Sequence, residues 1–342
     1  MSDVQDIETP RMVLRTRRVS FLLGMLFVLL MGATLYIGLW AAPLFRKDEL
    51  MVVQRRLDLN RILQGDPGMF WTNRPNLKGE LFESQSEGCG NAFRVTTNAL
   101  GMRGPATGEK GGRLRILAIG DSTTFGQYLE DHETWPAVLQ SLLDAEGARA
   151  EVLNAGVIGM SSFQGLAYLM ARGFDLQPDV VIATFGFNDR SPWDLRDREI
   201  APLFGRSRAG GQLLKMLQGM SARARPSQDA IQTRVTPGEF LDILIAMAKT
   251  CSARGVRLYL NLWPVPEQAA GSGVDEYAPL TYQSLIAEAA KWEPAGVIDL
   301  RRPFSESPEP VFCDGVHNTP AGARVVAETV HRRLREDGLP AR

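Results

Sequence analysis

The fold is decided by one stretch of the sequence, Leu114-Arg115-Ile116-Leu117-Ala118-Ile119-Gly120-Asp121-Ser122-Thr123-Thr124-Phe125-Gly126. Its first part is an apolar run, which is typical of a strand buried in a parallel sheet. Ser122 follows just past the end of this strand, where a helix would begin. Because ligands bind at the carboxyl ends of strands in open α/β sheets, Ser122 is placed where chemistry is usually done.

Strand-like and helix-like segments alternate after residue 113. Strands are predicted at 114–119, 151–154, 179–185, 256–262 and 296–300, and helices at about 134–146, 163–172, 238–253, 278–291 and 320–336. Thr236 and Thr319 each precede a proline, a residue favoured in the first helical turn because its missing N–H would have no partner there. This alternation predicts an α/β fold, a three-layer α/β/α sandwich with a five-stranded parallel sheet in flavodoxin-like order.

The N-terminal part carries no charge between Arg18 and Arg46. This run exceeds the roughly 20 apolar residues that cross a bilayer as a helix, so we predict a transmembrane helix at 19–42 after a cytoplasmic tail at 1–18. A buried core helix and a cleavable signal peptide are the alternatives, although the apolar region of a signal peptide is usually only about 7–15 residues. Residues 43–112 are interpreted as a linker and a loop-rich lead-in, with a short strand at 92–95.

Composition narrows the classes of partner. The chain has 342 residues and a formal net charge of −1, which gives no case for nucleic acid. Its three cysteines form no CxxC or Cys/His cluster, so we do not expect a structural zinc site. No metal or organic cofactor is implied by the sequence. Outside the cytoplasm Cys89 and Cys313 could form a disulfide, whereas Cys251, near the end of a predicted helix, is interpreted as a buried free thiol.

Two further strand ends carry residues suited to binding an oxyanion. Gly159 follows the second strand, where a backbone N–H can face a pocket with no side chain in the way. Asn188 follows the third strand, and its side-chain amide can donate to a developing negative charge. Taken singly, each residue also fits an ordinary turn or cap.

A histidine and an acid follow the last predicted strand. Of the three histidines, only His317 lies in a strand-to-helix loop, and Asp314 stands three residues before it. This spacing lets the carboxylate hold one ring nitrogen while the other faces Ser122. An isolated motif of this kind also fits a helix cap beside a surface histidine. The turn at Ser122 matches neither a phosphate-binding loop nor a GxSxG elbow.

The four blocks together resemble the SGNH (GDSL-type) hydrolase superfamily over roughly 113–336. They are Gly120-Asp121-Ser122, Asn154 to Gly159, Gly186 to Asp189, and Asp314 to His317. The resemblance implies Ser122 as the nucleophile, His317 as the base and Asp314 as the residue that orients it. It also implies an oxyanion hole made by the N–H groups of Ser122 and Gly159 and the amide of Asn188.

Residues 97–104 look like a lead-in of membrane-anchored bacterial members of this superfamily. We therefore expect a single-pass protein of the inner membrane with a catalytic domain at 113–342 on the extracytoplasmic side. Three functions stay open: a small-acyl or carbohydrate esterase acting through an acyl-enzyme, an O-acyltransferase on an envelope glycan, and a non-catalytic envelope binding module. The partner would be an acylated small molecule or glycan. Residues 190–235 form an insertion, interpreted either as a lid or as a surface excursion.

Overall fold

The computed structural model describes residues 25–26, 30, 61–84, 86–193, 196–204, 232–264, 279–291 and 295–339. The chain divides into two units, Met1–Leu57 and Asp58–Arg342, and the fold below is that of the second. The predicted tail at 1–18, nearly all of the predicted span at 19–42 and the middle of the insertion lie outside the described residues. No helix among the described residues is long and apolar enough to span a membrane.

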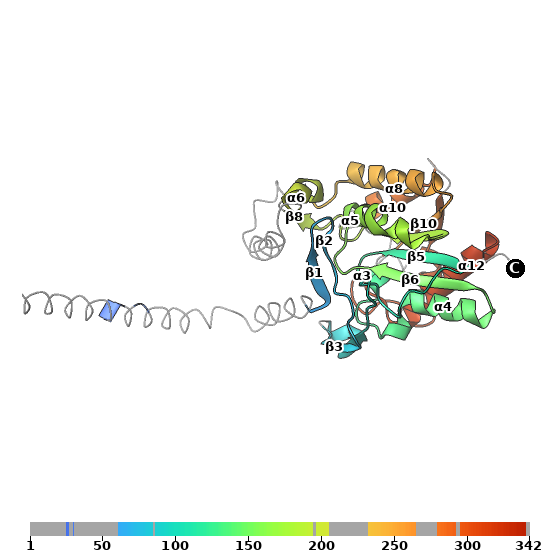
Figure 1. The fold of residues 1–342 in the computed structure, drawn as a ribbon, viewed down its shortest axis with the longest axis horizontal. Coiled ribbons are helices and arrows are strands. Elements are labelled where there is room, and N and C mark those ends of the chain that lie inside the picture. The colour runs from blue at the N-terminus through green and yellow to red at the C-terminus, as the bar shows by residue number, and fades with distance from the viewer. Residues whose placement is uncertain are drawn as a thin grey trace, which may run out of the picture. The chain divides into compact units, whose positions relative to one another are not determined.

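A five-stranded sheet lies at the centre of the second unit (Figure 1). Its strands are β5 (Leu114–Gly120), β6 (Ala150–Gly156), β7 (Val180–Thr184), β10 (Arg257–Leu262) and β11 (Ala295–Asp299). The spatial order is β11-β10-β7-β5-β6, and all four neighbouring pairs are parallel. In chain order this is the flavodoxin-like arrangement 2-1-3-4-5, so the prediction for the sheet is confirmed.

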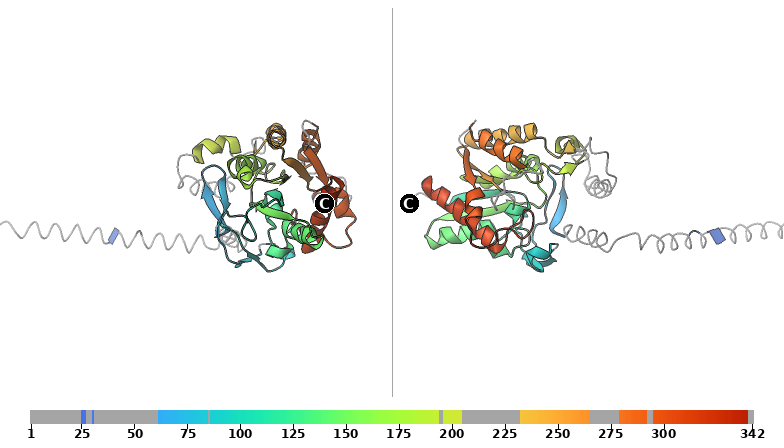
Figure 2. Two further views of the ribbon diagram at one scale, coloured as in Figure 1. Left: turned by 45° about the vertical axis from the view of Figure 1, so that its right-hand side comes forward. Right: turned by 180° about the vertical axis from the view of Figure 1, so that it is seen from behind.

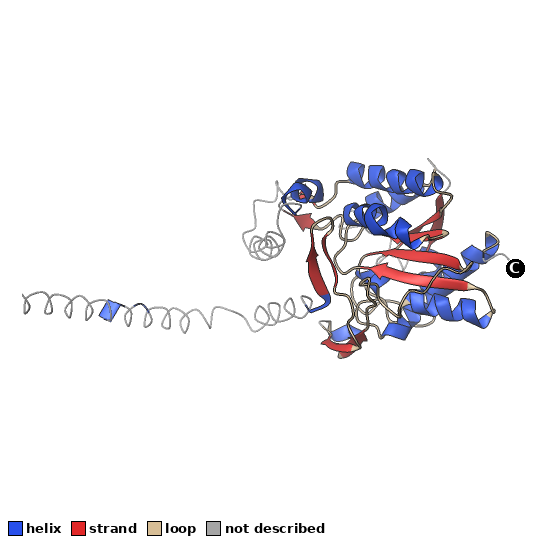
Figure 3. Cartoon of the chain, in the orientation of Figure 1, coloured by secondary structure: helices blue, strands red, loops and turns tan. Residues whose placement is uncertain are grey.

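Each central strand sends alternate side chains into two separate apolar clusters, because side chains in a strand alternate between its faces. Leu117 and Ile119 belong to one cluster, and Ile116 and Ala118 to the other; all four are fully buried. The first cluster is covered by α5 (Ser162–Tyr168), α8 (Pro237–Ser252) and α10 (Pro279–Ala289), and the second by α4 (Trp135–Ala145), α11 (Arg301–Ser305) and α12 (Pro320–Glu336). Figure 2 shows α8 and α12 on opposite sides of the sheet, and Figure 3 shows the three layers by type of element.

The helices begin at the caps that the sequence suggests. Thr236 accepts the N–H of Glu239 at the start of α8, and Thr319 accepts the N–H of Gly322 at the start of α12. The structure differs from the prediction at 163–172, where a single helix was expected. Its α-helical part ends at Tyr168, and the chain continues as a π-helical turn, η4 (Leu169–Gly173), and a 3-10 turn, η5 (Phe174–Leu176).

The lead-in is more regular than a loop and packs within the same unit as the sheet. Strand β1 (Leu63–Asp66) pairs antiparallel with β2 (Phe70–Asn73), and β3 (Glu80–Glu83) pairs antiparallel with β4 (Ala92–Val95). The buried Arg103 joins this region to the segment after Ser122 by donating to the main-chain carbonyls of Arg94, Phe125, Gly126 and Leu129. At the base of the insertion, β8 (Pro192–Trp193) pairs with β9 (Gln232–Thr233), and α6 (Asp197–Phe204) follows β8.

Candidate active site

Ser122 is the first residue of the short helix α3 (Ser122–Phe125), which follows directly after β5. The carboxylate of Asp121 caps this helix by accepting the N–H and the hydroxyl of Thr123, at 2.9 and 2.7 Å. Burial raises the pKa of Asp121, although the hydrogen bonds from Thr123 oppose this shift. The helix packs closely on β6, because a Cβ at Gly156 would lie 2.2 Å from the nitrogen of Phe125. A glycine at position 156 is therefore needed to seat Ser122.

The structure brings together Ser122, His317 and Asp314. Nε2 of His317 lies 2.8 Å from Oγ of Ser122, and Nδ1 lies 2.7 Å from Oδ2 of Asp314. The other carboxylate oxygen of Asp314 accepts the N–H groups of Val316 and His317, at 2.8 and 2.7 Å. Partial burial alone would raise the pKa of Asp314, but these hydrogen bonds and the His317 ring outweigh it and lower the pKa. An ionised Asp314 favours the tautomer with the proton on Nδ1, which leaves Nε2 to accept the serine proton.

The ring and loop of His317 are also held by aromatic residues. The ring of Tyr128 meets the His317 ring edge to face, with centroids 5.0 Å apart and planes at 83°. The indole N–H of Trp263 donates to the carbonyl of Val316 at 3.2 Å. The imidazole is thus restrained by a ring contact as well as by its carboxylate.

Cys89 and Cys313 form a disulfide, with α-carbons 4.8 Å apart, which is the pairing that the sequence left open as a possibility. The backbones pack closely here, because a Cβ at Gly88 would lie 2.2 Å from the carbonyl oxygen of Cys313. Cys251 is a buried free thiol, as expected, and burial raises its pKa to about 12. The one group of candidate metal ligands in the described part of the chain is Cys89, Cys313 and Asp314, and its two sulfur atoms are bonded to each other.

Gly159 lies in a tight turn over residues 157–160. The N–H of Met160 donates to the carbonyl of Val157 at 3.1 Å. The φ angle of Gly159 is 74°, whereas the φ angle of Ile158 is not positive. A positive φ at the third residue alone defines a type II turn. The N–H of Val157 donates to the carbonyl of Gly120 at 3.0 Å, so the turn lies beside the end of β5.

Asn188 connects the surroundings of Ser122 and of Gly159. Its Nδ2 donates to the carboxylate of Asp121 at 3.1 Å and to the carbonyl of Met160 at 3.3 Å. Within the described chain, the N–H groups of Ser122 and Gly159 donate to no other protein group. The three candidate oxyanion donors therefore lie in one region, and two of them are backbone N–H groups that none of the described residues accepts from.

Asp189 holds the segment that carries Asn188. Its fully buried carboxylate accepts the N–H and the hydroxyl of Ser162, at 2.9 and 2.6 Å, and the N–H of Gly186 at 2.9 Å. Burial raises the pKa of Asp189 to about 6, against the effect of these hydrogen bonds. This residue appears in the sequence as the neighbour of a candidate donor, and the structure assigns it a supporting role.

A buried ion pair beside the Gly159 turn was missed by sequence reasoning. Arg234 pairs with Asp197, with Nη2 3.0 Å from Oδ2, and both side chains are almost completely buried. Arg234 also donates to the carbonyl of Gly159 at 2.7 Å, and the hydroxyl of Ser161 donates to Asp197 at 2.5 Å. Both charged residues lie within the insertion at 190–235. This segment contains several arginines, and nothing in the sequence distinguishes Arg234 from the others.

Trp71, on β2, was missed as well. Its indole N–H donates to the carbonyl of Ile158 at 2.9 Å, and its ring packs under Gly159. The acceptor is a main-chain carbonyl far along the chain, and no local pattern indicates such a contact.

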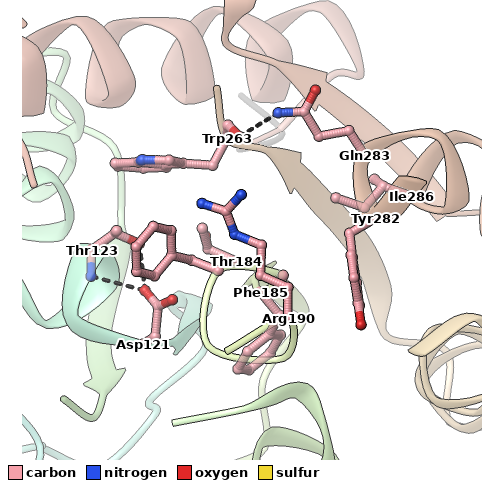
Figure 4. Close-up of a pocket in the computed structure, with 11 residues that line it drawn as sticks. Asp121, Thr123, Thr184, Phe185, Arg190, Trp263, Tyr282, Gln283 and Ile286 are labelled. Carbon is pink, nitrogen blue, oxygen red and sulfur yellow. Dashed lines mark hydrogen bonds between the residues drawn. The ribbon is translucent and has the colours of Figure 1, made fainter. Parts of the chain in front are cut away.

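A pocket of about 460 Å³, counting its open mouth, adjoins Asp121 at the ends of β7 and β10. Figure 4 shows the Arg190 guanidinium projecting into it toward the Trp263 indole. The Arg190 guanidinium also lies 4.7 Å from the centre of the Phe187 ring. The walls are mainly aromatic and aliphatic, and they include Thr123, Thr184, Phe185, Gly186, Tyr282, Gln283 and Ile286.

Residues 118–325 match the model of the GDSL-like Lipase/Acylhydrolase family. The chain is 32% identical over 106 residues to "Esterase TesA" of Pseudomonas aeruginosa, covering 30% of this chain and 52% of that protein. It is 36% identical over 74 residues to "Thioesterase 1/protease 1/lysophospholipase L1" of Escherichia coli K12, covering 22% and 34%. These matches span about half or less of the relatives' own length. A solved acetyl xylan esterase, AlAXEase, is similar with a TM-score of 0.46 at 17% identity, over 64% of this chain and 99% of that one.

Proposed function

Because the chain belongs to the GDSL-like lipase/acylhydrolase family, we propose that it is a serine-dependent ester hydrolase. The observation that carries the proposal is the position of His317, with one ring nitrogen 2.8 Å from Ser122 and the other 2.7 Å from Asp314. This is the geometry of a nucleophile, its base and the group that orients the base.

The reaction proceeds in two steps in this proposal. Oγ of Ser122 attacks the ester carbonyl carbon while Nε2 of His317 takes the serine proton. The tetrahedral intermediate collapses, the bond to the alcohol oxygen breaks, and His317 returns the proton to the departing alcohol. Water then attacks the acyl-enzyme, His317 takes its proton, and the acid leaves with Ser122 restored. Asp314 stabilises the imidazolium formed in both steps.

The negative charge on the carbonyl oxygen would be met by the N–H groups of Ser122 and Gly159 and by the amide of Asn188. The two backbone groups have no competing protein acceptor in the described chain. Asn188 has one longer bond, at 3.3 Å to the Met160 carbonyl, and this is the bond that the oxyanion would replace. Removing one such donor typically reduces turnover about 10²–10³-fold.

The substrate class follows from the same proposal: an acylated small molecule or carbohydrate, released as an acid and an alcohol. Transfer of the acyl group to a sugar hydroxyl would use the same residues with a different acceptor. We also propose that the catalytic unit lies outside the cytoplasm, anchored in the inner membrane by residues 19–42. The disulfide between Cys89 and Cys313 supports this placement, since disulfides persist in oxidising compartments.

The test is hydrolysis of p-nitrophenyl acetate and of longer-chain esters by the full-length chain in detergent. Ser122→Ala and His317→Ala should abolish turnover, and a serine-reactive phosphonate should label wild type but not Ser122→Ala. His331→Ala is the control for His317→Ala, because His331 lies on α12 beside Glu146, away from the site. If an added sugar acceptor is acylated faster than the ester is hydrolysed, the result would favour the acyltransferase. If the wild-type protein is folded but neither hydrolyses these esters nor reacts with the phosphonate, the result would instead favour a non-catalytic binding module.

A further inference from the structure

We propose that Trp71 is a positioning residue of the oxyanion hole, whose indole N–H fixes the direction of the Gly159 N–H. The inference rests on the proposed function, since it takes this N–H to be a donor to the oxyanion. Trp71 lies on β2 in the lead-in, outside the residues 118–325 that match the family. It would make part of the lead-in a component of the catalytic apparatus.

A single peptide group connects Trp71 with the N–H of Gly159. The carbonyl of Ile158 and the N–H of Gly159 belong to the same planar, trans peptide, so they point in opposite directions. The indole N–H of Trp71 donates to that carbonyl at 2.9 Å in a buried contact. Holding the carbonyl therefore also sets the direction of the N–H.

This peptide is the one that distinguishes two kinds of turn. Type I and type II turns differ mainly by a flip of the central peptide, which in the 157–160 turn is the Ile158–Gly159 peptide. Glycine adopts φ values of either sign at little cost, so Gly159 itself does not prevent the flip. A flipped peptide would point the Gly159 N–H away and would break the bond to Trp71. The indole thus favours the one orientation that is useful for catalysis.

The next peptide, between Gly159 and Met160, is held by Arg234, which lies near the C-terminal end of the insertion at 190–235. Nη1 of Arg234 donates to the carbonyl of Gly159 at 2.7 Å, and the guanidinium lies 5.4 Å from the centre of the Trp71 ring. Arg234 is fixed in turn by its buried pair with Asp197 and by Gln164, which accepts from it at 2.7 Å. Both peptides that flank the α-carbon of Gly159 are therefore anchored by buried donors.

The packing of Trp71 matches this role. A Cβ at Gly159 would lie 3.5 Å from Cζ2 of the indole, so the ring lies directly against the glycine. A donor placed so close to the turn polarises the peptide as well as orienting it, since hydrogen bonds in series strengthen one another. The N–H of Gly159 becomes a better donor when the carbonyl of its own peptide accepts a bond.

The test removes the N–H donor and keeps an aromatic side chain. Trp71→Phe should lower kcat about 5- to 30-fold with KM within about twofold of wild type, a smaller loss than removing an oxyanion donor outright. The affinity for a trifluoromethyl ketone, which forms a tetrahedral adduct with the serine, should fall by the same factor as kcat/KM. Unchanged kcat/KM and unchanged ketone affinity in Trp71→Phe would overturn the inference.

Two further variants separate positioning from a loss of folding. Trp135→Phe is the matched control, because Trp135 is 1% exposed and its indole N–H has no partner among the described residues. It should keep wild-type kcat, KM and ketone affinity. Benzothienylalanine at position 71 replaces only the N–H by sulfur in a ring of the same shape. It should reproduce the loss of kcat seen in Trp71→Phe while the protein remains folded.

The outcomes for the inference and for the proposed function are distinct. An active wild type with a labelled Ser122, together with a fully active Trp71→Phe, removes only the role of Trp71. A folded wild type that neither turns over esters nor reacts with the phosphonate at Ser122 removes the proposed function and the inference with it.

Discussion

Cys89 is bonded to Cys313, the residue immediately before Asp314, whose carboxylate lies 2.7 Å from the His317 ring. A covalent link from the lead-in therefore ends at the loop that carries Asp314 and His317. The same loop is closed by a hydrogen bond from the Cys313 N–H to the His317 carbonyl at 2.9 Å. The disulfide and this bond together restrict how far Asp314 and His317 can move relative to α3.

Reducing this disulfide should lower both stability and turnover. A long loop closed by a disulfide stabilises a protein by about 2–4 kcal/mol, and its loss would also loosen the loop that carries Asp314. We expect Cys89→Ser/Cys313→Ser to have a lower melting temperature and a lower kcat with a similar KM. Cys251→Ala is the control, since the thiol of Cys251 is buried and not part of the disulfide. An unchanged kcat in the double variant would show that the disulfide does not contribute to turnover.

Asp314→Asn should lower kcat by about 10³–10⁴-fold with little change in KM, because an amide at position 314 favours the wrong tautomer of His317. Steady-state kinetics on a soluble ester would measure this. Residual activity close to that of wild type would contradict the assignment of Asp314 and would point to another residue as the orienting group.

Gly159→Ala tests the backbone of the oxyanion turn. Alanine is strained at a φ of 74°, although its Cβ would make only an ordinary contact with the Trp71 ring. The variant should lose about 1 kcal/mol of unfolding free energy and should also lose kcat, as the peptide moves away from its native direction.

Gly338→Ala is the matched control for this variant. Gly338 has a φ of 76°, and a Cβ there would meet nothing within 4 Å. It should show a similar loss of stability in chemical denaturation with an unchanged kcat. Equal effects of the two variants on kcat would show that backbone strain at position 159 has no particular connection with catalysis.

The buried Asp189 predicts a pH dependence of stability. Its pKa is raised from 3.8 to about 6 by burial, so the native state binds more protons than the unfolded state between these values. Unfolding free energy contributed by this group is fully present below about pH 4 and is lost as pH rises through about 6, a change of about 3 kcal/mol.

Urea denaturation of wild type and Asp189→Asn across pH 4–7 would measure this contribution. The variant should be less stable overall, because its amide would face the N–H of Gly186, but it should lack the fall in stability that wild type shows. Asp144→Asn, an exposed carboxylate on α4, should keep the wild-type slope. A slope that is the same in all three proteins would contradict the raised pKa of Asp189.

The central sheet could be predicted because its strands are buried on both faces and appear as continuous apolar runs. The run at 114–119 corresponds to β5, and the flavodoxin-like order follows from strand–helix alternation together with right-handed crossovers. Ser122, Gly159 and Asn188 could be proposed because each follows a strand end of one parallel sheet. His317 could be proposed from its place before the last helix, although α11 separates its loop from the end of β11. The structure brings these residues into one region, and their catalytic roles stay predictions.

The surroundings of these residues could not be predicted, for a physical reason. Trp71 and Arg234 act on main-chain carbonyls 87 and 75 positions away, and a main-chain acceptor leaves no mark in the sequence. Of the four strands of the lead-in, β4 was predicted at 92–95; β1, β2 and β3 are only four residues long, too short to show a period of two against background composition. The membrane helix predicted at 19–42 lies almost entirely outside the described residues, and it stays a prediction.

The sequence separations at this site constrain when the protein can become active. Ser122 and His317 are 195 positions apart, and the two half-cystines are 224 positions apart. During synthesis, Ser122 and the lead-in leave the ribosome long before Asp314 and His317. A nascent chain therefore holds Ser122 without His317 beside it, and the site can assemble only after translation has passed residue 317.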